Sequence, residues 1–274
     1  MVTIKRVDKG KSRYYMVEGD PEVEGIPLPS VTTVLNIIAK PALVGWAKKI
    51  SLEKVREEML TEEVRHQLIP HDIGYGEWLD GMLSRAKARP DQVRDEAAEW
   101  GTQAHTWLSE VLEGKVEEEK VPEEFQPVVQ GFSAWGALNG LVFERSEWMV
   151  YSKLYKFAGT VDIGGYAVDV PGKQTKPFIA DLKTGSGVYK EAALQLGAYA
   201  FCDTEMTGQP IEEGWILHIP RKQPEKGESA FQAYRMDARH LKMAYWNFVN
   251  ALELWRGMKE VFWDGKENTQ TNNS

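Results

Sequence analysis

The apolar pattern of this chain changes its period near Gly140, and that change limits which folds the chain can adopt. Between Ser30 and Leu138, apolar residues recur every three or four positions, which is typical of amphipathic helices. From Val142 to Val170, apolar residues alternate with polar ones or run together in short blocks, which is typical of strands. The sequence therefore predicts a mainly helical first half followed by a sheet.

The predicted elements follow one another in the order helices, three strands, a helix, two strands and a helix. Helices are expected over residues 31–38, 42–60, 78–87, 91–112, 122–138, 188–203 and 238–263, and strands over 142–151, 157–170, 176–183, 214–219 and 230–236. A further strand over 13–17, followed by turn residues and closed near Ile26, predicts a small peripheral hairpin. This order predicts an α/β fold with a central mixed β-sheet flanked by helices, plus a helical N-terminal half.

We expect a single domain over residues 1–274, because this length buries a substantial core without disulfides or structural metals. Within it, residues 30–140 form the helical region, 141–264 the α/β core and 265–274 a disordered polar tail. No apolar run approaches the roughly 18 residues needed to cross a bilayer. The first residues also lack the apolar stretch of a secretory signal. A cytoplasmic protein without a membrane span is expected.

The cysteine count and the net charge restrict the kinds of site that the chain can carry. Cys202 is the only cysteine, which excludes an internal disulfide, a Cys-based zinc site and a four-cysteine iron–sulfur cluster within one chain. The formal net charge is -8, whereas proteins that coat nucleic acid non-specifically need many Lys and Arg contacts to phosphates. Any nucleic-acid site must therefore be local.

Two carboxylates interrupt apolar strands in the predicted sheet. Asp181 and Lys183 share one face of their strand because strand side chains alternate, and Leu182 points to the other face. Asp162 lies between Val161 and Ile163 on the preceding strand. Buried carboxylates on adjacent strands repel each other and resist desolvation unless a cation lies between them.

Magnesium suits such a pair, because this hard cation takes one or two carboxylates, keeps several waters and accepts phosphate oxygens. It polarises a phosphodiester and lowers the pKa of a bound water. Lys183 would then position that water or stabilise the negative charge of the transition state. Taken alone, however, an Asp-x-Lys strand end is also typical of a structural salt bridge.

Four short motifs occur in one order along the chain: Gly101-Thr102-Gln103-Ala104-His105, Gly159-Thr160-Val161-Asp162, Asp181-Leu182-Lys183 and Gln195-Leu196-Gly197-Ala198-Tyr199. They resemble the G-T-x-x-H, G-x-x-D, D-x-K and Q-x-x-x-Y motifs of the RecB-like branch of the PD-(D/E)xK nuclease superfamily. The segment from Pro29 to Leu43 resembles the start of phage-type members. The resemblance implies a restriction-endonuclease-like core.

The resemblance also implies roles for individual residues. It makes His105, Asp162 and Asp181 metal ligands, with the Leu182 carbonyl as a backbone ligand and Lys183 as the catalytic lysine. The remaining histidines match no metal spacing and are interpreted as incidental: His66, His71, His218 and His240.

Three further residues have both a functional and a structural interpretation. Glu147 adds an acid from the preceding strand, or it is a surface carboxylate of an edge strand. Gln195 and Tyr199 are four residues apart and so share one helix face. The resemblance implies that they orient the substrate backbone and the lysine, although the same helix also packs on the sheet.

The resemblance finally implies a function. We expect a DNA exonuclease that depends on Mg²⁺, for which Mn²⁺ substitutes, and that acts on single-stranded ends beneath a helical roof. Its setting would be DNA recombination, replication or repair, with proteins of those processes as partners. The single cysteine disfavours the branches that carry an iron–sulfur cluster. A structure-specific or restriction-type endonuclease would use the same residues, and a non-catalytic nucleic-acid-binding protein would keep only the fold.

Overall fold

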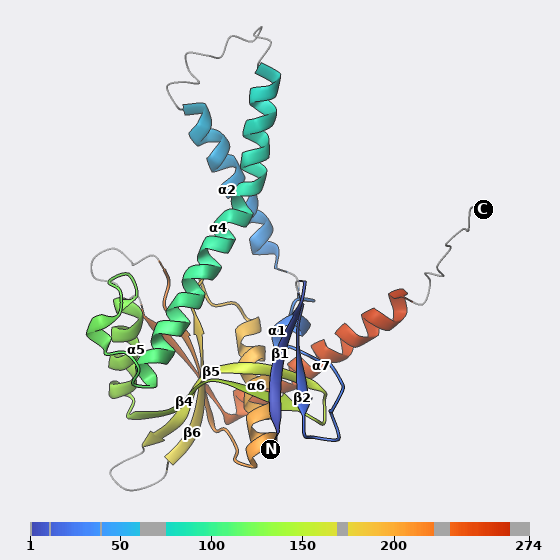
Figure 1. The fold of residues 1–274 in the computed structure, drawn as a ribbon, viewed down its shortest axis with the longest axis vertical. Coiled ribbons are helices and arrows are strands. Elements are labelled where there is room, and N and C mark those ends of the chain that lie inside the picture. Colours follow the sequence, from blue (N-terminus) through green and yellow to red (C-terminus); the bar gives the residue numbers. More distant parts are fainter. Residues whose placement is uncertain are drawn as a thin grey trace, which may run out of the picture. The chain divides into compact units, whose positions relative to one another are not determined.

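The structure is a computed structural model that describes residues 2–10, 12–38, 40–60, 75–168, 175–221 and 231–263 (Figure 1). The chain divides into two compact units. The first consists of residues 1–38 and 104–274, and the second of residues 39–103. Among the helices of the described ranges, none combines the length and the apolar character that a membrane span requires.

The first unit contains two sheets. The N-terminal sheet has three strands in the order β1 (Thr3–Lys9), β2 (Ser12–Glu18) and β3 (Leu28–Pro29). The main sheet has five strands in the order β4 (Leu141–Ser152), β5 (Phe157–Val168), β6 (Thr175–Lys183), β7 (Glu213–His218) and β8 (Gln232–Asp237). All neighbours in the main sheet are antiparallel except β6 and β7, which are parallel. The predicted mixed sheet in an α/β fold is confirmed.

The helices of the first unit are α1 (Val31–Leu35), the short 3₁₀ helix η1 (Glu118–Lys120), α5 (Gln126–Leu138), α6 (Glu191–Thr207) and α7 (Ala238–Trp263). Their ends follow local chemistry. The Ser30 hydroxyl accepts a hydrogen bond from the Thr33 N–H and caps α1. Gly208, with φ of 72°, supplies the left-handed residue that ends α6, which is why α6 extends beyond its predicted end at 203.

Helices cover both faces of the main sheet. Val161 of β5 and Ile179 of β6 lie in one buried cluster with Leu196 of α6 and Phe248 of α7. Phe178 precedes Ile179 and so points to the other face, where its ring contacts Phe143 with centroids 6.0 Å apart. Phe143 in turn contacts two rings of α5, those of Phe132 and Trp135, with centroid distances of 4.5 Å and 6.3 Å.

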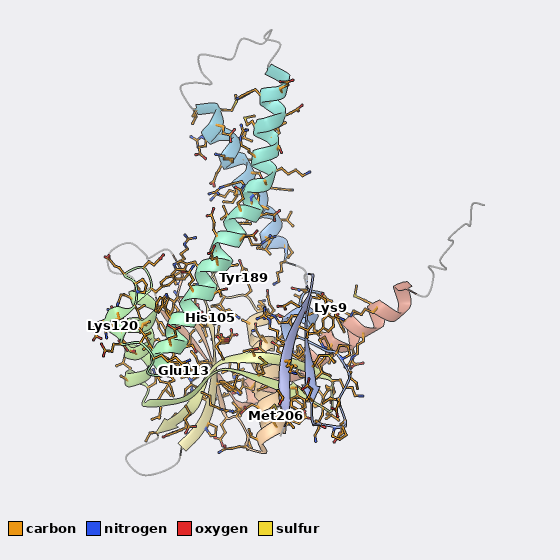
Figure 2. The ribbon with its side chains drawn as sticks, in the orientation of Figure 1. Lys9, His105, Glu113, Lys120, Tyr189 and Met206 are labelled. Atoms are coloured by element: carbon orange, nitrogen blue, oxygen red, sulfur yellow. The ribbon has the colours of Figure 1, made fainter. Side chains whose placement is uncertain are left out.

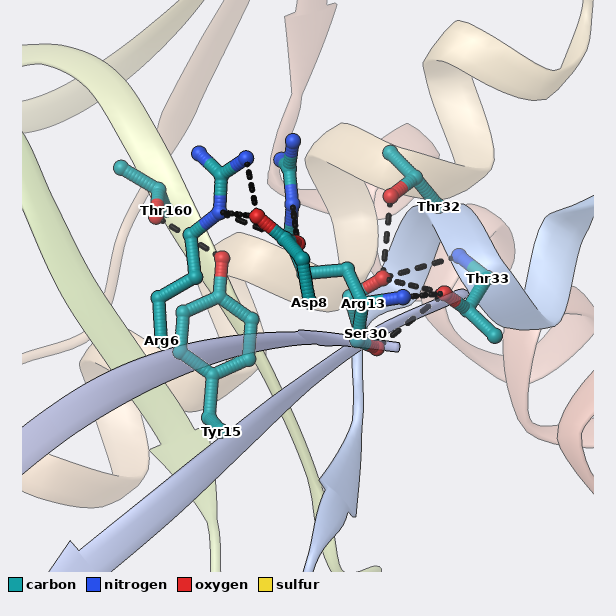
Figure 3. Close-up of polar contacts among 8 residues, drawn as sticks. All are labelled: Arg6, Asp8, Arg13, Tyr15, Ser30, Thr32, Thr33 and Thr160. Carbon is teal, nitrogen blue, oxygen red and sulfur yellow. Dashed lines mark hydrogen bonds and ion pairs between the residues drawn. The ribbon is translucent and has the colours of Figure 1, made fainter. Parts of the chain in front are cut away.

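The N-terminal hairpin differs from its prediction in partner and in position. β2 pairs with the upstream strand β1 along its whole length, whereas the predicted closure near Ile26 reduces to two pairs between β2 and β3. Nor is the hairpin peripheral, because Tyr15 and Leu28 are buried in a cluster with Ala158 of β5. The Tyr15 hydroxyl also hydrogen-bonds the Thr160 hydroxyl at 2.9 Å (Figure 3). The alternation of side chains on β2 predicts that one face of this strand is packed. It does not reveal that the packing partner is β5, more than 100 residues later in the chain.

The second unit contains α2 (Pro41–Leu60) and the first part of α4 (Tyr75–Leu112), a helix that continues into the first unit. Arg85 of α4 forms an ion pair with Glu58 of α2 at 2.7 Å. The two helices predicted over 78–87 and 91–112 are wrong as separate elements, because Pro90 lies inside one continuous helix. A proline removes a single helical hydrogen bond, and the strong helix formers around it sustain the turn.

Several predictions lie outside the described residues. These are the C-terminal part of the strand expected over 157–170, the first residue of that expected over 230–236, the disordered tail over 265–274, and the interpretation of His66 and His71.

Helices α6 and α7 approach each other closely at Gly197. A Cβ atom at this position would lie 2.6 Å from the Tyr245 backbone nitrogen and 2.8 Å from the Leu241 carbonyl oxygen. Next to this crossing, the rings of Phe201 and Tyr245 stack with centroids 4.0 Å apart. Because backbone atoms of α7 occupy the space, a side chain at residue 197 would force the two helices apart.

Replacing Gly197 with Ala should therefore lower the free energy of unfolding by about 1–3 kcal/mol, the usual cost of overpacking a core. Gly257→Ala is the matched control, since this glycine also lies in a helix but a Cβ atom there would meet no other atom within 4 Å. The control should raise stability by up to about 1 kcal/mol through helix propensity. Denaturant unfolding of both variants measures the difference, and equal stabilities would contradict the close crossing.

Candidate active site

The site forms where the ladder between β5 and β6 ends. The last backbone pair before the site joins Ile163 and Ala180. Beyond it, the Leu182 N–H donates to the Asp162 side chain at 2.8 Å instead of to a strand carbonyl. The carboxylate of Asp162 thus replaces a backbone acceptor and is fixed in place by the neighbouring strand.

Three side chains from three elements converge beside this point. His105 lies near the C-terminal end of α4 (Figure 2). Its Nδ1 atom lies 3.3 Å from Glu147 Oε1 of β4 and 3.6 Å from Asp162 Oδ2 of β5. One ligand atom from each of the three residues lies within 4.8 Å of the other two. The same small pocket is lined by Leu182 and by Ser109 of α4.

An unusual backbone conformation accompanies Glu147. Its φ is 48°, in the left-handed region that residues other than glycine rarely adopt. The side chains on either side face different partners, since the Ser146 hydroxyl bonds Ser109 of α4 at 2.8 Å and the Trp148 indole donates to Asp203 of α6 at 3.0 Å. Residues two apart on a regular strand would share one face. The strand is therefore twisted at the residue that reaches His105.

Asp181 belongs to a second network on the α6 side of the sheet. Its carboxylate lies 2.6 Å from the Lys183 ammonium and accepts a hydrogen bond from the Gln195 amide at 2.9 Å. The same amide donates to the Tyr199 hydroxyl at 2.9 Å, and its oxygen accepts from Lys183 at 3.1 Å. Gln195 therefore uses both N–H groups and its oxygen to hold three neighbours.

Burial and charge shift the titration of the site in opposite directions. Burial raises the pKa of Asp181 to about 6 against the attraction of Lys183, and it also raises the pKa of Asp162 against the attraction of His105. Burial would lower the pKa of His105, but Asp162 and Glu147 outweigh it and raise that pKa to about 9. Burial would also lower the pKa of Lys183, but the attraction of the neighbouring carboxylates, Asp181 first, outweighs burial and raises that pKa.

This set of donors fits a divalent cation. The site combines three carboxylates, Glu147, Asp162 and Asp181, with one permanent cation, Lys183. Two negative charges remain uncompensated when His105 is neutral, and one when it carries the proton that its raised pKa favours. The buried Asp181 Oδ2 atom has the Lys183 ammonium, 2.6 Å away, as its single partner among the described residues. Carboxylate oxygens suit Mg²⁺ or Mn²⁺, and the imidazole nitrogen adds a donor that transition ions accept.

The predicted ligands do not all lie together. His105 and Asp162 share the close cluster, and Glu147, for which the sequence left a surface carboxylate of an edge strand as the alternative, joins them. Asp181 lies outside this cluster and contacts Lys183 and Gln195. Leu182 lines the pocket beside the cluster. Helix α6 packs on the sheet, as its structural interpretation predicts, and Gln195 also contacts Lys183, whereas a role of Gln195 and Tyr199 toward substrate stays a prediction.

His218 has a neighbour that its sequence context did not indicate. It pairs with Lys183 across the parallel strands β6 and β7. Its Nε2 atom lies 2.8 Å from the Gly185 carbonyl oxygen, so Nε2 donates the hydrogen bond. The histidine thereby holds the turn that follows Lys183. Because helix α6 separates the parallel strands β6 and β7 in the chain, no local spacing in the sequence indicates that His218 lies beside Lys183.

The glycine of the second motif has a steric role. A Cβ at Gly159 would lie 2.3 Å from the ring of Tyr199. The ring is buried, and its hydroxyl accepts from Gln195. The absence of a side chain on β5 therefore lets α6 bring Tyr199 and Gln195 down to the catalytic carboxylate candidates.

Solved structures provide three similar proteins. The chain is similar to a candidate exonuclease from Eubacterium rectale (12% identity, TM-score 0.34, covering 57% of this chain and 67% of that one). It is similar to the protein SSO0001 (14% identity, TM-score 0.30, covering 78% of this chain and 86% of that one). It is also similar to an alkaline exonuclease from Laribacter hongkongensis (11% identity, TM-score 0.27, covering 48% of this chain and 68% of that one). Neither a family model nor a curated protein matches the chain. At these identities and TM-scores, its function is inferred from its own residues.

The contact between Gly159 and Tyr199 should appear as thermodynamic coupling. Gly159→Ala should destabilise the protein by about 1–3 kcal/mol through overpacking, and much less in a Tyr199→Ala background, where the ring is absent. We expect a coupling energy of at least about 1 kcal/mol from unfolding of both single variants and the double variant. Gly187→Ala is the control, because nothing lies within 4 Å of its Cβ position. Additive effects would refute the contact.

Proposed function

We propose that the chain is a metal-dependent nuclease that hydrolyses phosphodiester bonds in DNA. The observation that carries this proposal is the convergence of His105, Glu147 and Asp162 to within 4.8 Å of one another, next to the ion pair of Asp181 and Lys183. A nitrogen donor, clustered carboxylates and a buried amine supply the parts of metal-assisted phosphodiester hydrolysis. A purely structural salt bridge needs only the last two residues.

In this proposal His105, Glu147 and Asp162 hold the metal, and Asp181 borders it. When bound, Mg²⁺ or Mn²⁺ supplies Lewis-acid polarisation of the phosphodiester and a nucleophile at neutral pH. The Leu182 N–H fixes the orientation of Asp162 through a 2.8 Å hydrogen bond. A carboxylate that is already oriented loses little conformational freedom when it binds a cation.

Lys183 stabilises the charge that develops on the reacting phosphate. Its ammonium is oriented by Asp181 and by the Gln195 amide oxygen, 3.1 Å away. The side chain as a whole is 29% exposed, and its amine is fixed by these two partners. Such a preorganised cation stabilises a transition state without reorganising during the reaction. Gln195 and Tyr199 act as positioning residues for the lysine.

The finer proposal is an exonuclease that acts on single-stranded DNA ends, with Mg²⁺ as cofactor and Mn²⁺ as a substitute. DNA recombination, replication or repair would be its setting, together with protein partners from those processes. These features extend the motif resemblance, and assays with labelled DNA separate them from an endonuclease and from a protein that only binds nucleic acid.

Glu147 provides the sharpest test of the metal cluster, because its role as a ligand was open in the sequence. Glu147→Gln keeps the size of the side chain and removes its charge. It should weaken Mn²⁺ binding, measured by calorimetry, on the order of 10- to 100-fold. The control is Glu144→Gln, an exposed acid on the same strand. Equal affinities in both variants would exclude Glu147 as a ligand.

Lys183→Ala should leave Mn²⁺ and DNA binding intact and reduce turnover about 10²- to 10³-fold. The measurement uses 5′- and 3′-labelled single- and double-stranded DNA with Mg²⁺, Mn²⁺ or EDTA. Unchanged turnover in the variant would assign catalysis to another amine. Cleavage of a closed single-stranded circle would favour an endonuclease, and no cleavage of any DNA with either metal would favour a binding protein.

A further inference from the structure

A second concave surface of the first unit lies between the N-terminal hairpin and α7. It is lined by side chains from β1 to β3, from the turn before β5 and from α7: Lys9, Ser12, Tyr14, Ile26, Pro27, Pro29, Lys156, Trp255, Arg256 and Lys259. We refer to these residues as the basic groove. Four of them are cationic and none is acidic. Its volume of about 1060 Å³ is several times that of the pocket beside His105, at about 190 Å³.

Two of the four charges of the basic groove are available to a ligand without breaking an ion pair. Lys9 and Lys156 are exposed and form no ion pair with any described residue. Arg256 is held by Glu253 at 2.7 Å and donates to the Tyr155 carbonyl oxygen, which fixes its position at the edge of the groove. In a chain with a net charge of -8, this concentration of cations is a local site for an anion.

Two aromatic rings orient the fourth cation. The Lys259 ammonium lies 3.5 Å from the ring centroid of Trp255 and 5.7 Å from that of Tyr14. It also donates to the Tyr14 hydroxyl at 3.4 Å. These contacts join α7 to β2 across the groove. Apolar surface from Ile26, Pro27 and the rings thus lines the same groove as the positive charges.

The basic groove adjoins the elements of the active site through two strands. Tyr14 faces the groove, whereas the next residue, Tyr15, points the other way and bonds Thr160 of β5 (Figure 3). Lys156 immediately precedes β5, and Asp162 lies six residues further along the same strand. At about 3.3 Å per residue, the two positions are roughly 20 Å apart. A linear ligand of a few repeating units spans that distance.

We propose that the basic groove binds single-stranded nucleic acid, the remote part of a strand whose reacting phosphate lies at the candidate active site. Phosphates would pair with the four cations, and unstacked bases would contact the apolar surface between them. A duplex buries its bases in the helix stack and gains nothing from that apolar surface. The connection to cleavage rests on the proposed function, whereas strand binding in the groove does not.

The test removes the two unpaired lysines. Lys9→Gln/Lys156→Gln should weaken binding of a labelled 20-nucleotide single strand on the order of 10-fold at low salt. The slope of log affinity against log salt should fall by about 1.4, because each single-strand phosphate contributes about 0.7. Binding is measured by anisotropy in EDTA, so that no cleavage occurs. The matched control is Arg239→Gln/Lys242→Gln, two exposed cations of α7 outside the groove.

Two further measurements separate this proposal from the proposed function. Binding of a dinucleotide, which is too short to reach both regions at once, should change less than that of the 20-nucleotide strand. Hydrolysis of bis(4-nitrophenyl) phosphate with Mn²⁺ should be the same in the groove variant as in the unchanged protein. If that diester is not hydrolysed but strand binding still weakens, the nuclease proposal fails and the groove stands.

Three results would overturn the basic groove as a strand-binding site. The groove variant would bind the 20-nucleotide strand as tightly as the unchanged protein, or the control variant would lose as much affinity as the groove variant. A matched duplex that lost the same factor as the single strand would show a general polyanion surface instead. Thermal melting of each variant checks that the exposed substitutions leave the fold intact.

Discussion

The burial of carboxylates within the main sheet is the constraint on which the rest of the site depends. Asp181 is 1% exposed and the Asp162 side chain 14% exposed, and burial disfavours the charged form of both. Each carboxylate therefore needs donors or cations from its surroundings. Asp181 takes them from Lys183 and Gln195, and Asp162 takes them from His105 and the Leu182 N–H. Residues of β6, α4 and α6 supply these partners.

Irregular backbone also accompanies the site. Glu147 adopts a left-handed conformation that costs an L-residue about 1–2 kcal/mol, and the pairing of β4 with β5 shifts between Phe143 and Arg145. The twisted strand is anchored on the opposite side, where Asp203 of α6 accepts hydrogen bonds from Arg145 and Trp148. Packing thus stabilises a strained residue whose carboxylate faces His105, as is common where function sets local geometry.

The class of the fold could be predicted from the sequence because strand alternation and helical spacing are local properties. Asp162, Asp181 and Lys183 could also be predicted as neighbours, since one strand holds two of them. Three contacts between residues distant in sequence could not be predicted: the pairing of β2 with β1, the position of His218 beside Lys183 and the contact of His105 with Glu147. The rule that proline ends a helix predicted a break at Pro90, but the helix formers around it keep the helix continuous. The positive φ of Glu147 could not be predicted either, because glutamate does not favour that conformation.

The two proposed surfaces divide the requirements of a polyanionic substrate between them. A cluster of carboxylates repels phosphates, so the acidic site cannot attract a strand unless a cation neutralises it. The basic groove has four cations and no acid, and it attracts phosphates whatever the state of the metal site. Affinity would then depend on ionic strength and the groove, while chemistry would depend on the metal and Lys183. If the lysines of the groove lay close to the proposed metal ligands, they would form ion pairs with those carboxylates. Their separation along β5 prevents such pairs.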